Sequence, residues 1–244
     1  MSATLRTLAA ATALAAGLAA GAAQATVLTF DVDNTKPNAS VSMPQTYGDR
    51  VVATVQGGAT YGVGAEGFTG NVVVDYAGSP QTSLIRWPTS YGDLTNVLEN
   101  ETDGATYIDL TFTADAGFQV VLFGFDLAGW PSKDYLLPGG VRVTRGADSL
   151  FSQTNVLVQG DTTGPRHTSF DFGSGLAGQA LTLRIDLAGL ASNSDNIGLD
   201  NVRFGQVTLP TTAVPEPATW ALMILGLAGA GAALRQRRRC AAAG

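Results

Sequence analysis

The sequence has one cysteine and one histidine among its 244 residues. One cysteine cannot form a disulfide within the chain, so a disulfide-stapled scaffold is excluded. A zinc site needs clustered histidine and cysteine side chains, and these are also missing. Charged residues make up only 14% of the chain against 45% hydrophobic residues, which excludes disorder for most of it. The length suits one sizeable domain with additional segments, or two small domains.

Basic residues are scarce as well. The chain has 14 lysines and arginines but 20 acidic residues, so its formal net charge is −6. Proteins that bind nucleic acid carry basic patches, so no nucleic-acid partner is expected. Catalysis by a serine or cysteine nucleophile normally needs a base, and His167, the one histidine, lies in a stretch typical of a solvated loop. We therefore predict no catalytic residues and expect a protein that is not an enzyme.

The N-terminal segment has the pattern of an export signal. Arg6 supplies one positive charge, and an uncharged run rich in alanine and leucine follows over residues 7–23. Ala23 and Ala25 then stand in the small-x-small order that signal peptidase cleaves. The sequence predicts a signal peptide over residues 1–25, with Thr26 as the first mature residue.

A second uncharged run lies near the other end, from Ala218 to Leu234. As a helix rising about 1.5 Å per residue it would measure roughly 25 Å, at the short end for crossing a bilayer. Arginines stand directly after it, at Arg235, Arg237, Arg238 and Arg239. Such a cluster stays cytoplasmic, so the preceding chain is expected outside the inner membrane. We predict a single transmembrane helix with Trp220 at its outer interface.

The residues before this run carry a specific motif. Pro215, Glu216 and Pro217 are followed by Trp220 and Ala221, then by the uncharged run and the arginines. Over residues 214–239 this order resembles the PEP-CTERM sorting signal in its PEPxxWA form. The two prolines disfavour helix in the residues before them, so we expect an extended motif at the membrane surface.

The resemblance implies a destination and a partner. In Gram-negative bacteria such tails are recognised by exosortase, a membrane-embedded cysteine protease/transpeptidase that removes the tail near the motif. The protein would be exported across the inner membrane, anchored there transiently, and then released to the cell surface or the extracellular matrix.

The sequence predicts one β-rich domain over residues 26–213. These residues include 19 acidic and nine basic side chains, so the formal charge of the domain is −10. Short β-branched or alternating segments recur between glycine-rich turns, which indicates an antiparallel β-sandwich of jelly-roll type. Ile108, Leu110 and Phe112 are expected to share a core-facing side. The expected strands are Thr26–Asp33, Arg50–Val55, Asn71–Tyr76, Ser83–Trp87, Thr106–Thr113, Phe118–Leu127 (a central strand), Val141–Arg145, Asn155–Gln159, Thr168–Phe172, Leu181–Leu187 and Ile197–Val207.

The last of these strands has a second resemblance. The run from Ile197 to Phe204 is similar to the final strand of galactose-binding-like and carbohydrate-binding jelly rolls. In those families an aspartate of this strand often joins a first-strand residue at a structural calcium, which implies Asp31 and Asp200 here. The alternative is that these residues serve turns, because aspartate and asparagine bond to their own backbone. No other cofactor is expected.

Aromatic residues in loop-like stretches leave the function of the domain open between two classes. Trp87, Tyr91, Trp130 and Tyr135 lie close to prolines or glycines, where aromatic side chains stack on sugar rings or cap a core. We expect an exported, non-catalytic surface or matrix protein with extracellular polysaccharide as a candidate partner. The alternative is a secreted polysaccharide hydrolase, which a pair of carboxylates in one cleft would favour.

Overall fold

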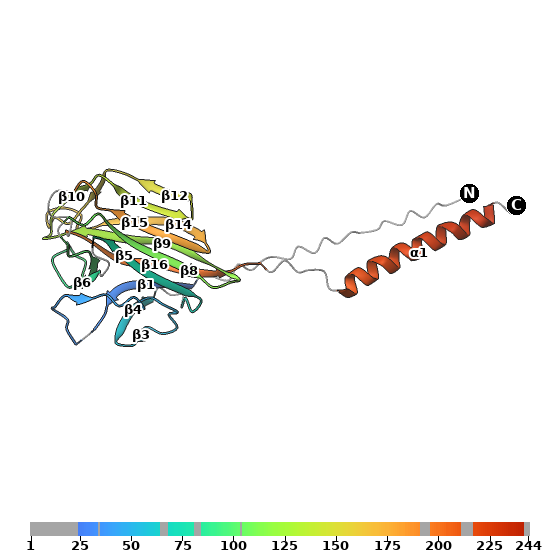
Figure 1. The fold of residues 1–244 in the computed structure, drawn as a ribbon, viewed down its shortest axis with the longest axis horizontal. Coiled ribbons are helices and arrows are strands. Elements are labelled where there is room, and N and C mark those ends of the chain that lie inside the picture. The colour runs from blue at the N-terminus through green and yellow to red at the C-terminus, as the bar shows by residue number, and fades with distance from the viewer. Residues whose placement is uncertain are drawn as a thin grey trace, which may run out of the picture. The chain divides into compact units, whose positions relative to one another are not determined.

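The computed structural model describes residues 24–33, 35–63, 68–80, 84–102, 104–190, 196–210 and 217–241. The chain divides into two units, Met1–Thr208 and Leu209–Gly244. The described residues of the first unit form antiparallel β-sheets, and those of the second form the helix α1, Pro217–Ala241 (Figure 1). The expected antiparallel β class is therefore confirmed.

The strands form one large sheet, one smaller sheet and a two-stranded ribbon. The large sheet consists of β1 (Gln24–Asp31), β2 (Val41–Ser42), β3 (Val55–Gln56), β4 (Ala59–Val63), β6 (Ile85–Trp87), β7 (Val97–Glu99), β9 (Phe118–Gly129), β14 (Thr168–Gly178) and β16 (Ile197–Thr208). The smaller sheet, in spatial order, consists of β12 (Asp148–Gln153), β11 (Gly140–Arg145), β15 (Ala180–Asp186), β8 (Tyr107–Ala114) and β5 (Val72–Ser79). The ribbon pairs β10 (Tyr135–Leu137) with β13 (Val156–Val158).

Strand β16 organises the large sheet. Along one edge it pairs with β9, and along the other it pairs with β7 at Leu199 and with β1 from Val202 to Gln206. Strand β9 also pairs with β14, so it is the central strand that its nearly continuous apolar sequence predicts. This arrangement brings the ends of β6, β7 and β9 and the start of β16 into one region of the fold.

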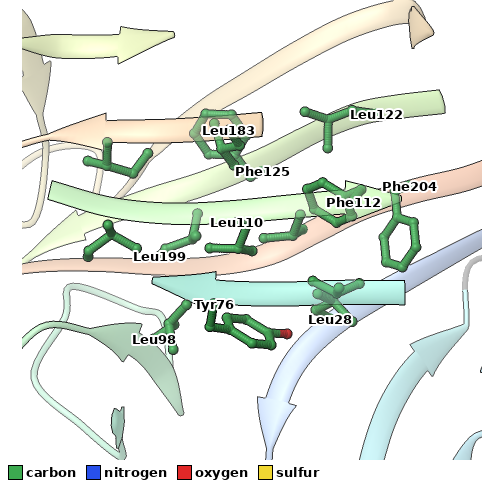
Figure 2. Close-up of a cluster of buried hydrophobic side chains, with 14 of the residues drawn as sticks. Leu28, Tyr76, Leu98, Leu110, Phe112, Leu122, Phe125, Leu183, Leu199 and Phe204 are labelled. Carbon is green, nitrogen blue, oxygen red and sulfur yellow. The ribbon is translucent and has the colours of Figure 1, made fainter. Parts of the chain in front are cut away.

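The large sheet and the smaller sheet share one hydrophobic core. Phe112 of β8 and Phe204 of β16 come from different sheets, and their ring centroids are 4.9 Å apart. Each fully buried leucine or phenylalanine stabilises the fold by about 1.5–3 kcal/mol. Figure 2 shows this core, to which Leu28, Tyr76, Leu98, Leu110, Leu122, Phe125, Leu183 and Leu199 also contribute.

Alternation along β8 and β15 agrees with the sequence pattern. Ile108, Leu110 and Phe112 are all fully buried, whereas Thr111 and Thr113 on the other face are not. In β15 the buried residues are Leu181, Leu183 and Ile185. The core face of β8 was therefore predicted correctly, and β15 shows the same alternation.

One expected strand is wrong. Residues 50–55 form turns, bends and an isolated bridge at Val51, and only Val55 enters a strand, the two-residue β3. Arg50 has a positive φ of 47°, and its N–H donates to the carbonyl of Val72 at 2.8 Å. Its guanidinium binds both carboxylate oxygens of Asp115, at 2.6 and 2.9 Å. These tertiary contacts hold the segment as a turn despite its β-branched residues.

Candidate functional site

One pocket brings together three of the four aromatic residues singled out in the sequence. Trp87 is the last residue of β6, Tyr91 lies in the β6–β7 loop, and Trp130 directly follows β9. The pocket has a volume of about 100 Å³ and opens to solvent, and its other lining residues are Glu99, Glu101 and Asn196. We refer to it as the aromatic pocket.

The β6–β7 hairpin sets the first wall of the pocket. Trp87 pairs with Val97, so the two side chains lie on the same face of the hairpin, and Glu99 shares that face because strand residues alternate. Arg86 and Leu98 point to the opposite face. The sheet register therefore directs an aromatic ring and a carboxylate to the same side.

Backbone contacts hold the second wall. The N–H of Trp130 donates to the carbonyl of Asn196 at 2.9 Å, and the hydroxyl of Tyr135 donates to the carbonyl of Trp130 at 2.6 Å. The rings of Trp87 and Trp130 meet edge to face with centroids 6.5 Å apart, and both are only partly buried. Tyr135 is thus outside the pocket lining and helps to position Trp130.

Two carboxylates complete the pocket. Glu99 is buried, with 3% of its surface exposed, and it accepts a hydrogen bond from the hydroxyl of Tyr91. Glu101 is exposed. Among the described lining residues there is no lysine, arginine or histidine, so the pocket has an acidic character.

Two larger hollows lie beside the β3–β4 hairpin, with volumes of about 250 and 300 Å³. The second has no aromatic residue among its described lining residues. In the first, the rings of Tyr47 and Tyr61 stack on one another at 4.8 Å and are only 2% and 6% exposed. These rings belong to the core and offer no free face to a ligand. The aromatic pocket is the better candidate site although it is smaller.

Asp200 lies at the start of β16 in an almost fully buried position, with 5% of its surface exposed. The pKa of its carboxyl is raised to about 8, mainly by burial and to a smaller extent by the negative charges of Asp126 and Asp31. The N–H of Asn201 donates to Oδ1 at 2.7 Å and opposes this rise. Asp126, directly opposite on β9, accepts hydrogen bonds from Ser169 at 2.7 Å and Asn201 at 3.0 Å.

Asp31 ends β1 and accepts a hydrogen bond from the side-chain amide of Asn96. The guanidinium of Arg86, 2% exposed, donates to Asn96 Oδ1 at 2.8 Å and to the carbonyls of Lys36 at 2.7 Å and Ala39 at 2.8 Å. The amide oxygen of Asn96, the side chain that contacts Asp31, therefore binds this guanidinium. Over the described part of the chain, no three acidic, histidine or cysteine side chains are grouped to hold a metal. The calcium ligands Asp31 and Asp200 stay a prediction.

His167 lies in a loop before β14, as expected. Its Nδ1 is 2.8 Å from Oδ1 of Asp93, and 34% of its side chain is exposed. This pair joins the loop before β14 to the β6–β7 loop.

Helix α1 begins at Pro217, a residue well suited to the first helical position because its missing N–H has no intrahelical role there. Four consecutive side chains, Leu222 to Leu225, are each more than half exposed within this unit. A helix that is apolar on all sides normally lies in apolar surroundings. Within the described residues, no helix combines the length and the hydropathy that a membrane span requires.

A comparison with protein families decides what this tail is. Residues 213–239 match the family model described as the PEP-CTERM protein-sorting motif. The chain carries a PEP-CTERM sorting motif. The motif supports an exported protein that is sorted through exosortase, as the sequence predicts. No curated protein and no solved structure matches the chain significantly.

The structure describes only part of the PEP-CTERM segment and of the export signal. Pro215 and Glu216 lie outside the described residues, while Pro217, Trp220 and Ala221 are in α1. Arg235 is exposed; Arg237, Arg238 and Arg239 belong to α1, and their side chains are not described. Ala23 also lies outside the described residues, whereas Ala25 is in β1 opposite Gly205. Both processing sites stay predictions.

Sequence reasoning missed Glu99 and Glu101. Their signal is the alternation of Val97, Glu99 and Glu101, which places all three on one side of an extended segment. The strand that this segment forms, β7, is only three residues long, and none of the strands predicted from the sequence includes it.

Proposed function

We propose that this is an exported, non-catalytic surface or matrix protein that binds carbohydrate in the aromatic pocket after exosortase removes its PEP-CTERM tail. The observation that carries the proposal is that Trp87 and Trp130, far apart in sequence and both partly exposed, converge on one pocket open to solvent. In sugar sites, aromatic rings pack against the apolar faces of the sugar, and a few fixed polar groups bind its hydroxyls. Asn196 and Glu101 are suitably placed polar groups.

The sheet topology supports the finer fold assignment, a jelly-roll sandwich. The first and last long strands, β1 and β16, are antiparallel neighbours, and β9 and β14 continue the same sheet. The smaller sheet packs on the other side of the common core. Many carbohydrate-binding modules have this architecture, which makes a glycan partner plausible on fold-level analogy.

The tail supports a membrane-held stage before sorting. The sequence from Ala218 to Leu234 has no charge, and the arginines after it favour a cytoplasmic end. The exposed apolar side chains of α1 would be covered by lipid in that stage. The inner membrane and exosortase are then successive partners of the tail.

A glycan array probed with the full chain in detergent tests the binding proposal. We expect retention on a subset of polysaccharide fragments, and a loss of about fivefold or more in affinity for Trp87→Ala and Trp130→Ala, because stacking of a ring on an aromatic side chain contributes about 1–3 kcal/mol. Trp220→Ala makes the same substitution in α1 and should bind like the unaltered protein. No binding to any glycan, by a protein whose unfolding transition is normal, would overturn the proposal.

A secreted polysaccharide hydrolase is the second candidate, and one observation favours it. Glu99 and Glu101 line the same pocket, and glycosidases use two carboxylates flanking the scissile bond. Release of reducing ends from a polysaccharide by the unaltered protein, abolished in Glu99→Gln and Glu101→Gln, would establish this function. Binding without release of reducing ends would leave the non-catalytic proposal in place.

A further inference from the structure

The charge of the aromatic pocket points to one class of sugar. We infer that the pocket prefers a saccharide that carries a protonated amine, such as a glucosamine oligomer, over neutral or acidic saccharides. This inference rests on the proposed carbohydrate binding and specifies its ligand.

The carboxylates give the first argument. Glu101 is exposed at the pocket, and Glu99 is held in place by the hydroxyl of Tyr91. A carboxylate is an acceptor without a proton to donate, and it binds an ammonium group more strongly than a neutral hydroxyl. An acidic sugar would instead bring its own negative charge against the exposed carboxylate of Glu101.

The positions of nearby cations give the second argument. Lys133 lies close in sequence to Trp130, but its ammonium sits over the ring of Tyr135, 5.6 Å from the centroid. Arg86, the neighbour of Trp87 in β6, points to the opposite face of the hairpin. Among the described residues that line the pocket, the exposed carboxylate of Glu101 therefore has no lysine or arginine beside it.

The rings give the third argument. An ammonium group within about 6 Å of a ring centroid is attracted by the face of the ring, most strongly by tryptophan. The pocket offers two partly exposed tryptophans next to the carboxylates. An amine-bearing sugar ring thus gains stacking, cation–π attraction and a charged hydrogen bond in the same place, whereas a neutral ring gains stacking and neutral hydrogen bonds.

Calorimetry with four tetrasaccharides tests the inference on the full chain in detergent. The ligands are glucosamine tetramer, its fully N-acetylated form, a neutral glucose tetramer and a galacturonic acid tetramer, at a pH where the amine is protonated. We expect the glucosamine tetramer to bind about tenfold more tightly than the N-acetylated one, and the acidic one to bind most weakly. The preference should decrease with added salt.

Matched variants separate the pocket from the general negative charge of the domain. Glu101→Gln should bring the affinity ratio of the glucosamine and N-acetylated tetramers towards one. Asp148→Asn removes one exposed carboxylate from β12 of the other sheet and should leave the ratio unchanged. A ratio lowered equally by both variants would overturn the inference, because the preference would then come from overall charge.

The remaining outcomes are also decisive. Equal affinity for the amine-bearing and N-acetylated tetramers overturns this inference and leaves carbohydrate binding intact. Binding of tetramethylammonium as tight as that of the glucosamine tetramer also overturns it, because the pocket would then recognise a cation without the sugar. Failure of all four tetramers, together with a silent glycan array, overturns the proposed function itself.

Discussion

At the scale of single residues, the aromatic pocket depends on a glycine that packs against Tyr91, one of its lining residues. A Cβ at Gly198 of β16 would lie 2.6 Å from Cγ2 of Val97 and 2.7 Å from Cδ1 of Tyr91, closer than packed carbon atoms approach. We predict that Gly198→Ala lowers the free energy of unfolding by about 1–3 kcal/mol through overpacking. Urea denaturation measures the change. Gly164→Ala is the matched control, because its Cβ meets nothing within 4 Å; equal stability of the two variants would contradict the assigned role of Gly198.

A second effect of a single residue is that Asp200 makes the free energy of unfolding depend on pH. Its folded pKa of about 8 lies above the ordinary value of 3.8, so between these pH values the folded state holds a proton that the unfolded state has lost. The associated stability is complete below about pH 4 and is lost as the pH rises through 8. We predict that the free energy of unfolding falls between pH 5 and pH 8 by up to about 4 kcal/mol.

The variant Asp200→Asn isolates this effect, because its amide resembles the protonated acid and does not titrate. The neighbouring carboxylates, Asp126 and Asp31, are present in both proteins, so the difference between the two pH profiles belongs to Asp200. Guanidinium denaturation at pH 5, 6, 7 and 8 gives both profiles. Parallel profiles would show that Asp200 is ionised in the folded protein and would contradict its assigned protonation.

At the scale of elements, Arg86 joins β6 to the loop over residues 36–39. Its three hydrogen bonds satisfy two backbone carbonyls and the amide oxygen of Asn96 in a buried position. Removing the guanidinium leaves these acceptors without their partner, so we predict that Arg86→Met costs about 2–4 kcal/mol in the free energy of unfolding. Arg145→Met, at a position on β11 where the side chain is 49% exposed, should cost less than about 1 kcal/mol. Similar losses in the two variants would contradict this picture.

The length of each strand explains how much of the fold the sequence could predict. Long strands such as β8 and β15 carry enough alternation to reveal their buried face, and the apolar run of β9 indicates a central strand. Short strands such as β7 carry too few residues for any period, so the carboxylates at its end were missed. The aromatic residues were found by type and loop context, but their convergence depends on the register of β6, β7, β9 and β16, which local pattern does not encode.

At the scale of the whole molecule, the chain combines two independent kinds of chemistry. The unit Met1–Thr208 contains the core and the aromatic pocket, and the unit Leu209–Gly244 contains the PEP-CTERM motif. Within the described part of the chain, the residues that form the core all belong to the first unit. Removal of the tail should therefore leave the fold of the β domain and its pocket unchanged, and this property is what a sorting signal that is cut off requires.

This separation leads to a prediction about sorting. Replacement of Pro215, Glu216 and Pro217 by alanine removes the motif but keeps the uncharged run and the arginines that favour membrane retention. We predict that cells then accumulate a longer, membrane-retained product, whereas the unaltered protein is cleaved near the motif and released. Mass spectrometry of the protein recovered from membrane and external fractions, with and without exosortase, gives the mass and location of each product.

Two comparisons make that experiment decisive. Pro210→Ala changes a proline outside the matched residues 213–239 and should be processed normally, so loss of processing in the triple variant reports on the motif and not on proline content. The triple variant in normal cells and the unaltered protein in cells without exosortase should give the same long product. The first lacks the motif that exosortase recognises, and the second lacks exosortase itself. Normal cleavage in either case would show that another determinant or another enzyme directs the processing of the tail.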